Sequence, residues 1–234
     1  MQCKVLFAAL PALGLAFASS GAPISGTGFS VDTIVEFGVT DDAGTDYNGW
    51  SRWVMVEEAS AEQGPDGIGL PPGGLVTSQF GTQFQLEAYD GPNTLINGDT
   101  FTLDTPAQFT DIQFFITGIG GNTTDNFTAT LNFSDATTTD LQFTVNDWQG
   151  SRPYNAFTFE TSYSRRASAQ TIDLWNRELA FTLDPGDQLK TLESIDFTLL
   201  DRLGLSAVSG TVIPEPTSMA LLGLGGLLVA RRRR

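Results

Sequence analysis

Apolar and polar side chains alternate along most of the chain between residues 29 and 212. In the heptapeptide FTATLNF at residues 127–133, every odd position is apolar and every even position is Thr or Asn. A period of two is typical of a β-strand that turns one face to a core and the other to water. The same pattern, bounded by Gly, Pro, Asn and Asp, predicts about ten or eleven strands. They are expected at residues 29–39, 52–57, 80–89, 100–103, 109–117, 127–133, 141–145, 157–159, 179–183, 195–199 and 205–212.

Turn-forming residues separate these strands. The tetrapeptides DGPN at residues 90–93 and DPGD at 184–187 carry the Gly, Pro and Asp that tight turns favour. One helix-like stretch is predicted at residues 165–175, and residues 64–74 are expected to form a long irregular loop within one domain. Because strands do not alternate with helices, the pattern disfavours a parallel α/β fold. It predicts an all-β domain, a two-sheet antiparallel β-sandwich of the jelly-roll type.

Residues 1–22 differ from this pattern. Lys4 precedes an almost wholly apolar run at residues 5–18, and small residues follow that run. This order predicts a secretory signal peptide with a helical apolar segment. Two cleavage sites fit the small-residue rule, one after Ala18 in the tripeptide AFA and one after Ala22 in SGA. Both sites remain open from the sequence.

Residues 214–234 form a second distinct segment. The tripeptide Pro214-Glu215-Pro216 cannot continue a helix or sheet, so we expect it to be extended and accessible. The apolar residues 219–230 that follow would make a helix about 18 Å long, which is short for a hydrocarbon core of ~30 Å. The chain then ends in four arginines, which would hold that end on the cytoplasmic side of a membrane: Arg231, Arg232, Arg233 and Arg234.

This three-part tail closely resembles the PEP-CTERM sorting signal of Gram-negative bacteria. The resemblance implies that an exosortase, a membrane cysteine transpeptidase, recognises the tail and cleaves it near Pro-Glu-Pro after the Sec machinery has exported the chain. It also implies a location in the cell envelope or outside the cell, with a transient or retained inner-membrane anchor. A plain C-terminal anchor is the alternative, and it differs only in whether the helix is later removed.

Composition narrows the chemistry of the domain between these ends. Residues 23–213 keep 26 of the 27 acidic and 7 of the 12 basic residues, a net charge of −19. This balance argues against a nucleic-acid partner, and the absence of His from the chain excludes His-dependent triads and His-ligated metal centres. The one Cys, Cys3, would leave with the signal peptide, so a hydrophobic core rather than disulfides must stabilise the domain.

Several short motifs lie between residues 69 and 148. They are GLPPGG at 69–74, FQL and YDGPN between 84 and 93, and TLNFSD and VNDW between 130 and 148. These motifs resemble segments of secreted bacterial β-sandwiches that are similar to jelly-roll carbohydrate-binding modules. The resemblance implies a sandwich fold and does not carry an activity with it.

Carboxylates are the acid–base groups that remain for an enzyme. A glycosidase needs two of them across a cleft, about 5–10 Å apart. Jelly-roll glucanases place theirs at alternate positions of one strand, whereas Glu57 next to Glu58, and Asp173 with Glu178, have the wrong spacing. No G-x-S-x-G or phosphate-binding loop occurs either. We therefore expect no catalytic residue, and a carboxylate-dependent glycoside hydrolase is the weakest hypothesis.

Calcium is the one ion that the loops favour, and no other cofactor is expected. Four oxygen-bearing side chains are its predicted ligands: Asp41, Asp42, Asp46 and Asn48. Their spacing is not that of an EF-hand, because Gly44 and Met55 stand where carboxylates belong. Asp90 with Asn93 is a further source of oxygen ligands. A solvated turn is the alternative at each loop.

Tryptophan offers a way to bind sugar, because its face stacks on the apolar face of a pyranose. Trp148 is the leading candidate, with Asp147 and Gln149 beside it as partners for sugar hydroxyls. Trp50 with Arg52 is the second. The alternative is that these rings pack in the core or at a sheet edge.

Three hypotheses follow for the function. The first is a non-enzymatic cell-surface or extracellular-matrix protein, exported and then sorted through its C-terminal tail. The second is a lectin-like carbohydrate-binding module, stabilised by calcium, with an extracellular polysaccharide as its partner. The third is the carboxylate hydrolase.

Overall fold

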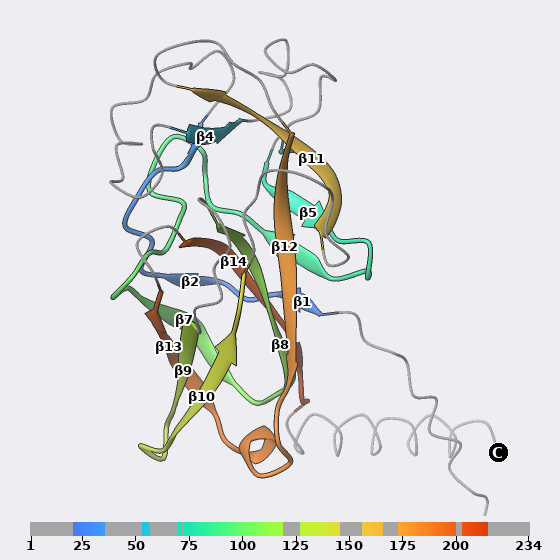
Figure 1. Cartoon of the computed structure of the whole chain (residues 1–234). Helices are drawn as coiled ribbons and strands as arrows, with labels where there is room; N and C mark the ends of the chain where they lie inside the picture. The colour runs from blue at the N-terminus through green and yellow to red at the C-terminus, as the bar shows by residue number, and fades with distance from the viewer. Residues whose placement is uncertain are drawn as a thin grey trace, which may run out of the picture.

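The computed structural model of the chain describes residues 21–35, 53–56, 70–71, 73–118, 127–145, 156–165, 173–199 and 203–214. Within them the chain forms two β-sheets packed face to face, with a small third sheet outside one of them (Figure 1). The two-sheet sandwich predicted from the period-two pattern is therefore confirmed.

The larger sheet has seven strands in the order β1-β14-β8-β12-β11-β4-β3. Their bounds are Ala22–Pro23, Leu203–Val212, Phe109–Gly118, Asp173–Thr182, Ala156–Arg165, Trp53–Val56 and Ile34–Val35. The second sheet has five strands in the order β10-β9-β13-β7-β2. Their bounds are Thr138–Phe143, Phe127–Phe133, Leu192–Thr198, Thr100–Ala107 and Gly26–Thr27. Neighbouring strands run antiparallel except β3 and β4, which are parallel.

The core lies between these two sheets and is rich in phenylalanine. Along β9 the side chains at odd positions are buried and those between them are not, as the alternation predicts. Phe114 on β8 is fully buried, and its ring centroid lies 5.7 Å from that of Phe197 on β13 in the opposite sheet. Because burying one such side chain contributes roughly 1.5–3 kcal/mol, these ring contacts hold the two sheets together.

A third layer covers the outer face of the seven-stranded sheet. It is the hairpin of β5 (Leu75–Thr77) and β6 (Gln83–Gln85). Phe84 on β6 packs edge-on against Phe115, whose ring centroid lies 5.8 Å away on the outer face of β8. With layers on both faces, residues 203–210 of β14 are buried without alternation. The sequence pattern did not predict β5. The hairpin explains why residues on both faces of β14 are buried.

Two finer expectations differ from the structure. The helix-like stretch at 165–175 is wrong where it is described, since Arg165 ends β11 and residues 173–175 begin β12. Pairing of β12 with both β11 and β8 outweighs the local preference for a helix. The strand expected at 29–39 is reduced in its described part to an isolated bridge of Val31 with Thr94 and to β3, because the backbone of residues 28–33 makes no continuous ladder.

Along the described strands from β7 to β14, five of the seven steps change sheet, as most do in a jelly roll. The hairpins β9–β10 and β11–β12 each stay within one sheet. The described strands show the two-sheet sandwich, and the jelly-roll type stays a prediction.

The sandwich has two ends that matter for function. At one end, which we call the tail end, the Ile213 N–H donates to the Gln108 carbonyl (2.8 Å), and the Gln108 side chain donates to the Leu189 carbonyl (2.9 Å). At the opposite end, the far end, β8 stops at Gly118 beside Leu203, the first residue of β14. The five-stranded sheet has Phe127 and Phe143 at its far end.

Candidate functional site

The last strand of the sandwich delivers the chain to its Pro-Glu-Pro segment. Val212 still pairs with Phe109 on β8, and the Ile213 N–H bond to Gln108 closes the ladder. Val212 is half exposed, and Pro214 is exposed just beyond it. The last backbone hydrogen bond of β14 is therefore made one residue before the tail begins, so that cutting the tail would leave the sheet whole.

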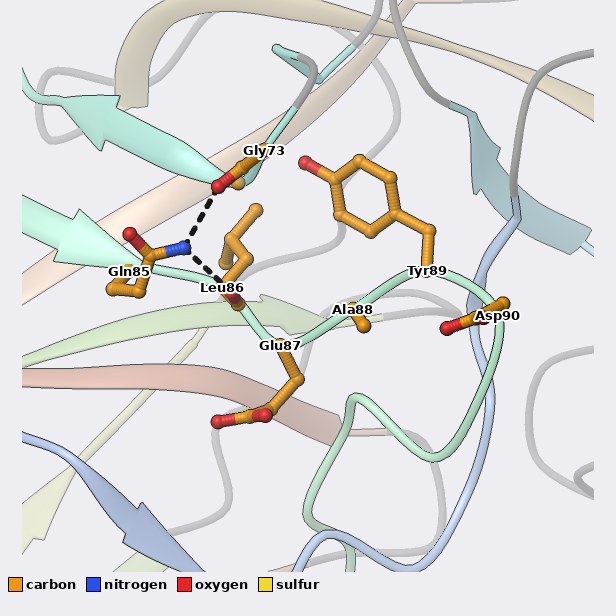
Figure 2. A pocket seen from close by; sticks show the side chains of 8 residues that line it. Gly73, Gln85, Leu86, Glu87, Ala88, Tyr89 and Asp90 are labelled. Atoms are coloured by element: carbon orange, nitrogen blue, oxygen red, sulfur yellow. Dashed lines mark hydrogen bonds between the residues drawn. The ribbon is translucent and has the colours of Figure 1, made fainter.

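A hollow lies beside the small third sheet (Figure 2). It has a volume of about 610 Å³ and is lined by Gly73, Gly74, Gln85, Leu86, Glu87, Ala88, Tyr89 and Asp90. Figure 2 shows the Glu87 carboxylate and the Tyr89 hydroxyl pointing to opposite sides of the segment that carries them. The hollow was not foreseen from the sequence.

Backbone geometry at two glycines shapes one wall of this hollow. Gly73 and Gly74 have φ of +76° and +72°, a left-handed conformation that strains residues with a Cβ. The Gln85 amide donates to the carbonyls of Gly73 (2.8 Å) and Leu86 (2.9 Å) and so ties this turn to β6. Gly73 and Gly74 thus form the bend that starts the third layer.

The Tyr89 ring closes the opposite side. Its hydroxyl donates to the Pro71 carbonyl (2.8 Å), and the residue is 7% exposed. Because this hydroxyl donates to a backbone carbonyl, Tyr89 has a structural role and links its own segment to Pro71. The polar groups that the hollow offers to a ligand are then the carboxylates of Glu87 and Asp90 and the amide of Gln85.

Glu87 is the electrostatically perturbed member of this group. Partial burial raises the pKa of its carboxyl above the ordinary 4.5, and the negative charge of Asp104 raises it further. A carboxyl of this kind can accept hydrogen bonds from hydroxyls or, when protonated, donate one. That chemistry suits a neutral polyhydroxylated ligand.

The outer face of the five-stranded sheet carries a second polar surface. Asp196 on β13 accepts from Thr100 Oγ1 (2.6 Å) on one side and from Asn132 Nδ2 (2.9 Å) on the other. Asp140 on β10 accepts from Thr130 Oγ1 (2.7 Å) in the same row. Hydroxyl and amide donors on neighbouring strands satisfy these carboxylates, so they stabilise the sheet as cross-strand pairs.

The sequence-predicted ligand residues lie outside the described residues. This holds for the sugar-binding candidates Trp148, Asp147, Gln149, Trp50 and Arg52, and for the calcium candidates Asp41, Asp42, Asp46 and Asn48. Of the sorting residues, Pro214 is described, while Glu215, Pro216, Arg231, Arg232, Arg233 and Arg234 are not. These interpretations stay predictions.

The structure also tests the suggested calcium ligands Asp90 and Asn93. Asn93 is fully buried, and its side-chain oxygen accepts from the backbone N–H groups of Thr33 (3.0 Å) and Ile34 (3.2 Å). Its amide nitrogen donates to the Ile34 carbonyl (2.9 Å) and to Asp32 (2.8 Å). The Asn93 oxygen is committed to the backbone, so the expected pairing of Asp90 with Asn93 as calcium ligands is wrong.

The described residues hold neither a cluster of metal-ligating side chains nor a membrane-spanning helix. No three Asp, Glu, Cys or His residues among them stand close enough to share a metal ion. No helix in this part of the chain has the length and apolar character needed to span a membrane. The predicted apolar helix at 219–230 and the signal-peptide helix lie outside it.

Comparison with known proteins identifies a sorting motif in the tail. Residues 212–234 match the PEP-CTERM protein-sorting motif. The matched segment begins at Val212, the last residue of β14, so motif and fold meet at the tail end. No curated protein matches the chain. The motif implies an exported protein that an exosortase processes and sorts to the cell surface.

Proposed function

We propose that this chain is a non-enzymatic structural protein of the cell surface or extracellular matrix, whose β-sandwich is the cargo of its C-terminal sorting motif. One observation carries the proposal: the sorting motif starts where the hydrogen-bonded ladder of β14 ends. Pro214 is exposed, so an exosortase can reach the tail while the sandwich is folded. After cleavage, the bond from Ile213 to Gln108 remains.

Several features support a non-enzymatic role. The chain has no His, and its single Cys lies in the predicted signal peptide. In the hollow of Figure 2, the Tyr89 hydroxyl is held by a backbone carbonyl, which leaves Glu87 and Asp90 as its acidic groups. On the outer sheet face the carboxylates are paired with threonine hydroxyls. Pairing of this kind is typical of carboxylates that stabilise a sheet.

A carbohydrate-binding role is the second candidate. Two described residues flank the predicted ligand-binding segments. Val145 is the last described residue before Trp148, and Trp53 directly follows the segment that holds the calcium candidates, Trp50 and Arg52. Val145 follows β10 at the far end, and Trp53 pairs with Arg165, on the part of β11 that runs past β8. A protein held at its tail end would present the far end outward, where a polysaccharide or a calcium ion can reach it.

Sorting is tested with the full chain in a Gram-negative host that has an exosortase, beside the same strain lacking the enzyme. We expect a shortened, surface-exposed form only in the first strain. Replacing Pro214, Glu215 and Pro216 together by Ala should leave the chain unshortened in the membrane fraction, whereas the neighbouring Thr217→Ala change should process normally. Equal shortening of the triple variant would contradict the sorting role.

Binding is tested on the processed protein by affinity electrophoresis against bacterial and algal polysaccharides, with and without calcium. The structural role predicts no retardation by any glycan. Retardation lost in Trp148→Ala, or in Trp50→Ala, would favour the lectin-like role at the far end. Retardation lost in Glu87→Gln would place the sugar in the hollow beside the third sheet.

A further inference from the structure

The first described residues of the chain are part of the sheet. β1 lies at the edge of the seven-stranded sheet, where Ala22 pairs with Gly210 and Pro23 with Ser209. Proline is tolerated at a sheet edge because its missing N–H would face away from the ladder. β1 thereby covers the edge of β14, the strand that leads to the sorting motif.

Ala22 satisfies a buried donor. Its carbonyl accepts from the hydroxyl of Ser209 (2.7 Å), and Ser209 is 0% exposed. If the chain began at Pro23, this hydroxyl would keep its buried position and lose its acceptor. A buried polar group left without its partner costs about 1–3 kcal/mol.

Gly21 joins β1 to the third layer. Its carbonyl accepts from the Gln83 N–H of β6 (3.1 Å). Gly21 is itself buried, and a Cβ built on it would clash with the Gln113 side-chain oxygen. The backbone of Gly21 thus packs against the Gln113 side chain, which is 7% exposed. A chain that began at Pro23 would lack both this contact and the hydrogen bond to β6.

The two peptide bonds that fit the small-residue rule also differ chemically. The bond after Ala22 joins it to Pro23, so it is a tertiary amide without an N–H. Pro23 offers no N–H beyond this bond, and its ring fixes φ near −65°, so the bond suits the cleft of a protease poorly. The bond from Ala18 to Ser19 is an ordinary secondary amide, three residues before the first described residue of the fold.

We propose that signal peptidase cuts after Ala18, so that the exported chain begins at Ser19 and keeps Gly21, Ala22 and Pro23 as a working edge strand. The folded domain then covers residues 19–213, four residues more than the signal-peptide boundary at residue 22 allows. This inference needs export alone and does not depend on the sorting step.

The register of β1 adds a geometric consequence. Because Ala22 pairs with Gly210 in an antiparallel ladder, Gly21 lies beside Thr211, close to the exit of the sorting motif. The leader and the tail therefore leave the sandwich together at the tail end. Both processing enzymes act on membrane-bound segments, and this arrangement offers both cleavage sites on the side of the domain that faces the membrane.

The direct test is to export the full chain in a Gram-negative host, purify the product, and determine its first residues by N-terminal sequencing and its intact mass. We expect the sequence to start Ser-Ser-Gly-Ala. A product that starts at Pro23 would overturn the proposal. N-terminal sequencing fixes the first residue whether or not the tail is removed, and the intact mass then gives the last residue, so a failure of C-terminal sorting would leave this result readable.

Two matched substitutions test the site itself. Ala18→Leu removes the small residue before the proposed bond and should leave most of the chain with its leader attached. Ala22→Leu places the same side chain before the other bond, at a position exposed in the fold, and should be cut like the wild-type chain. Normal processing of Ala18→Leu, or a block in Ala22→Leu, would count against cleavage after Ala18.

Discussion

At the scale of single residues, Asn93 does more for the fold than its place in a turn suggests. Its buried side-chain amide accepts hydrogen bonds from the N–H groups of Thr33 and Ile34 and donates one to the Ile34 carbonyl. It therefore holds in place a segment about sixty residues earlier in the chain. Replacing Asn93 by Ala leaves these backbone groups unpaired inside the protein. We expect a loss of about 2–4 kcal/mol in the free energy of unfolding, measured by urea denaturation.

Asn132 provides the control for that change. Its amide bonds Ser194 and Asp196 on the solvent-facing side of the sheet, where water can replace it. Asn132→Ala should therefore cost less than about 1 kcal/mol. Equal losses in the two variants would show that burial of the Asn93 network is not what stabilises the segment.

Glu87 gives the protein a pH dependence that can be isolated. Because burial and Asp104 raise the pKa of Glu87 in the folded state, the folded chain holds this proton more tightly than the unfolded chain does. Stability from this group is complete below the ordinary pKa of 4.5 and falls as the pH rises through the raised value. Glu87→Gln should therefore be more stable than wild type at pH 7 and lose that advantage near pH 4.

Urea unfolding of both proteins at these two pH values checks the expectation. Glu193→Gln is the matched control, since Glu193 is an exposed residue on β13. As a surface substitution, it should leave stability within about 0.5 kcal/mol of wild type at pH 7. A Glu87→Gln variant that is less stable at pH 7 would mean that the charged carboxylate makes a favourable contact in the fold.

At the scale of elements, the N-terminal segment is held close to β7 by a glycine. Gly28 has φ of +121°, and a Cβ there would lie 2.0 Å from the backbone oxygen of Thr100. Gly98 has φ of +87° and open space around it, so an added Cβ meets strain but no clash. Gly98→Ala should cost about 1–2 kcal/mol and Gly28→Ala roughly 1–3 kcal/mol more, by urea unfolding. Similar losses would show that β2 can move away from β7.

The elements also show which parts of the structure a sequence can predict. β9 occupies residues 127–133 as predicted, because one of its faces is buried and the other wet, which is the condition that produces alternation. β14 was also predicted, at 205–212 against Leu203–Val212, although the third layer buries both of its faces and its burial does not alternate. β12 was partly read as a helix because its partners β8 and β11 lie far away in the chain.

The candidate sites divide in the same way. The sorting tail was predictable because its order of Pro-Glu-Pro, apolar run and arginines is contiguous in the chain. The hollow beside β6 was not, because the fold alone brings Asp104 to Glu87 and the Pro71 carbonyl to Tyr89. Asn93 was read as a loop oxygen because its backbone partners at Thr33 and Ile34 are distant in sequence.

At the scale of the whole molecule, the two ends of the sandwich differ in what is attached to them. Its first strand and its last strand both meet the membrane-directed segments at the tail end, through the pairing of Ala22 with Gly210. The far end lies at the other limit of β8, beside Gly118 and Leu203. Exported in this orientation, the domain needs no rearrangement when the leader and then the tail are removed, because neither cut breaks a strand.

The completeness of the domain after processing is the last prediction. A chain of residues 19–213 keeps every described pair of β14 and should unfold within about 0.5 kcal/mol of the full-length protein. A chain that stops at Ser209 loses the pairs of Gly210, Thr211 and Val212 with β8 and the bond from Ile213 to Gln108. We expect that loss to cost about 2–5 kcal/mol in urea unfolding. If instead the chain ending at Ile213 were the unstable one, the tail would be part of the fold, and its removal by an exosortase would carry a structural penalty that the ladder of β14 does not indicate.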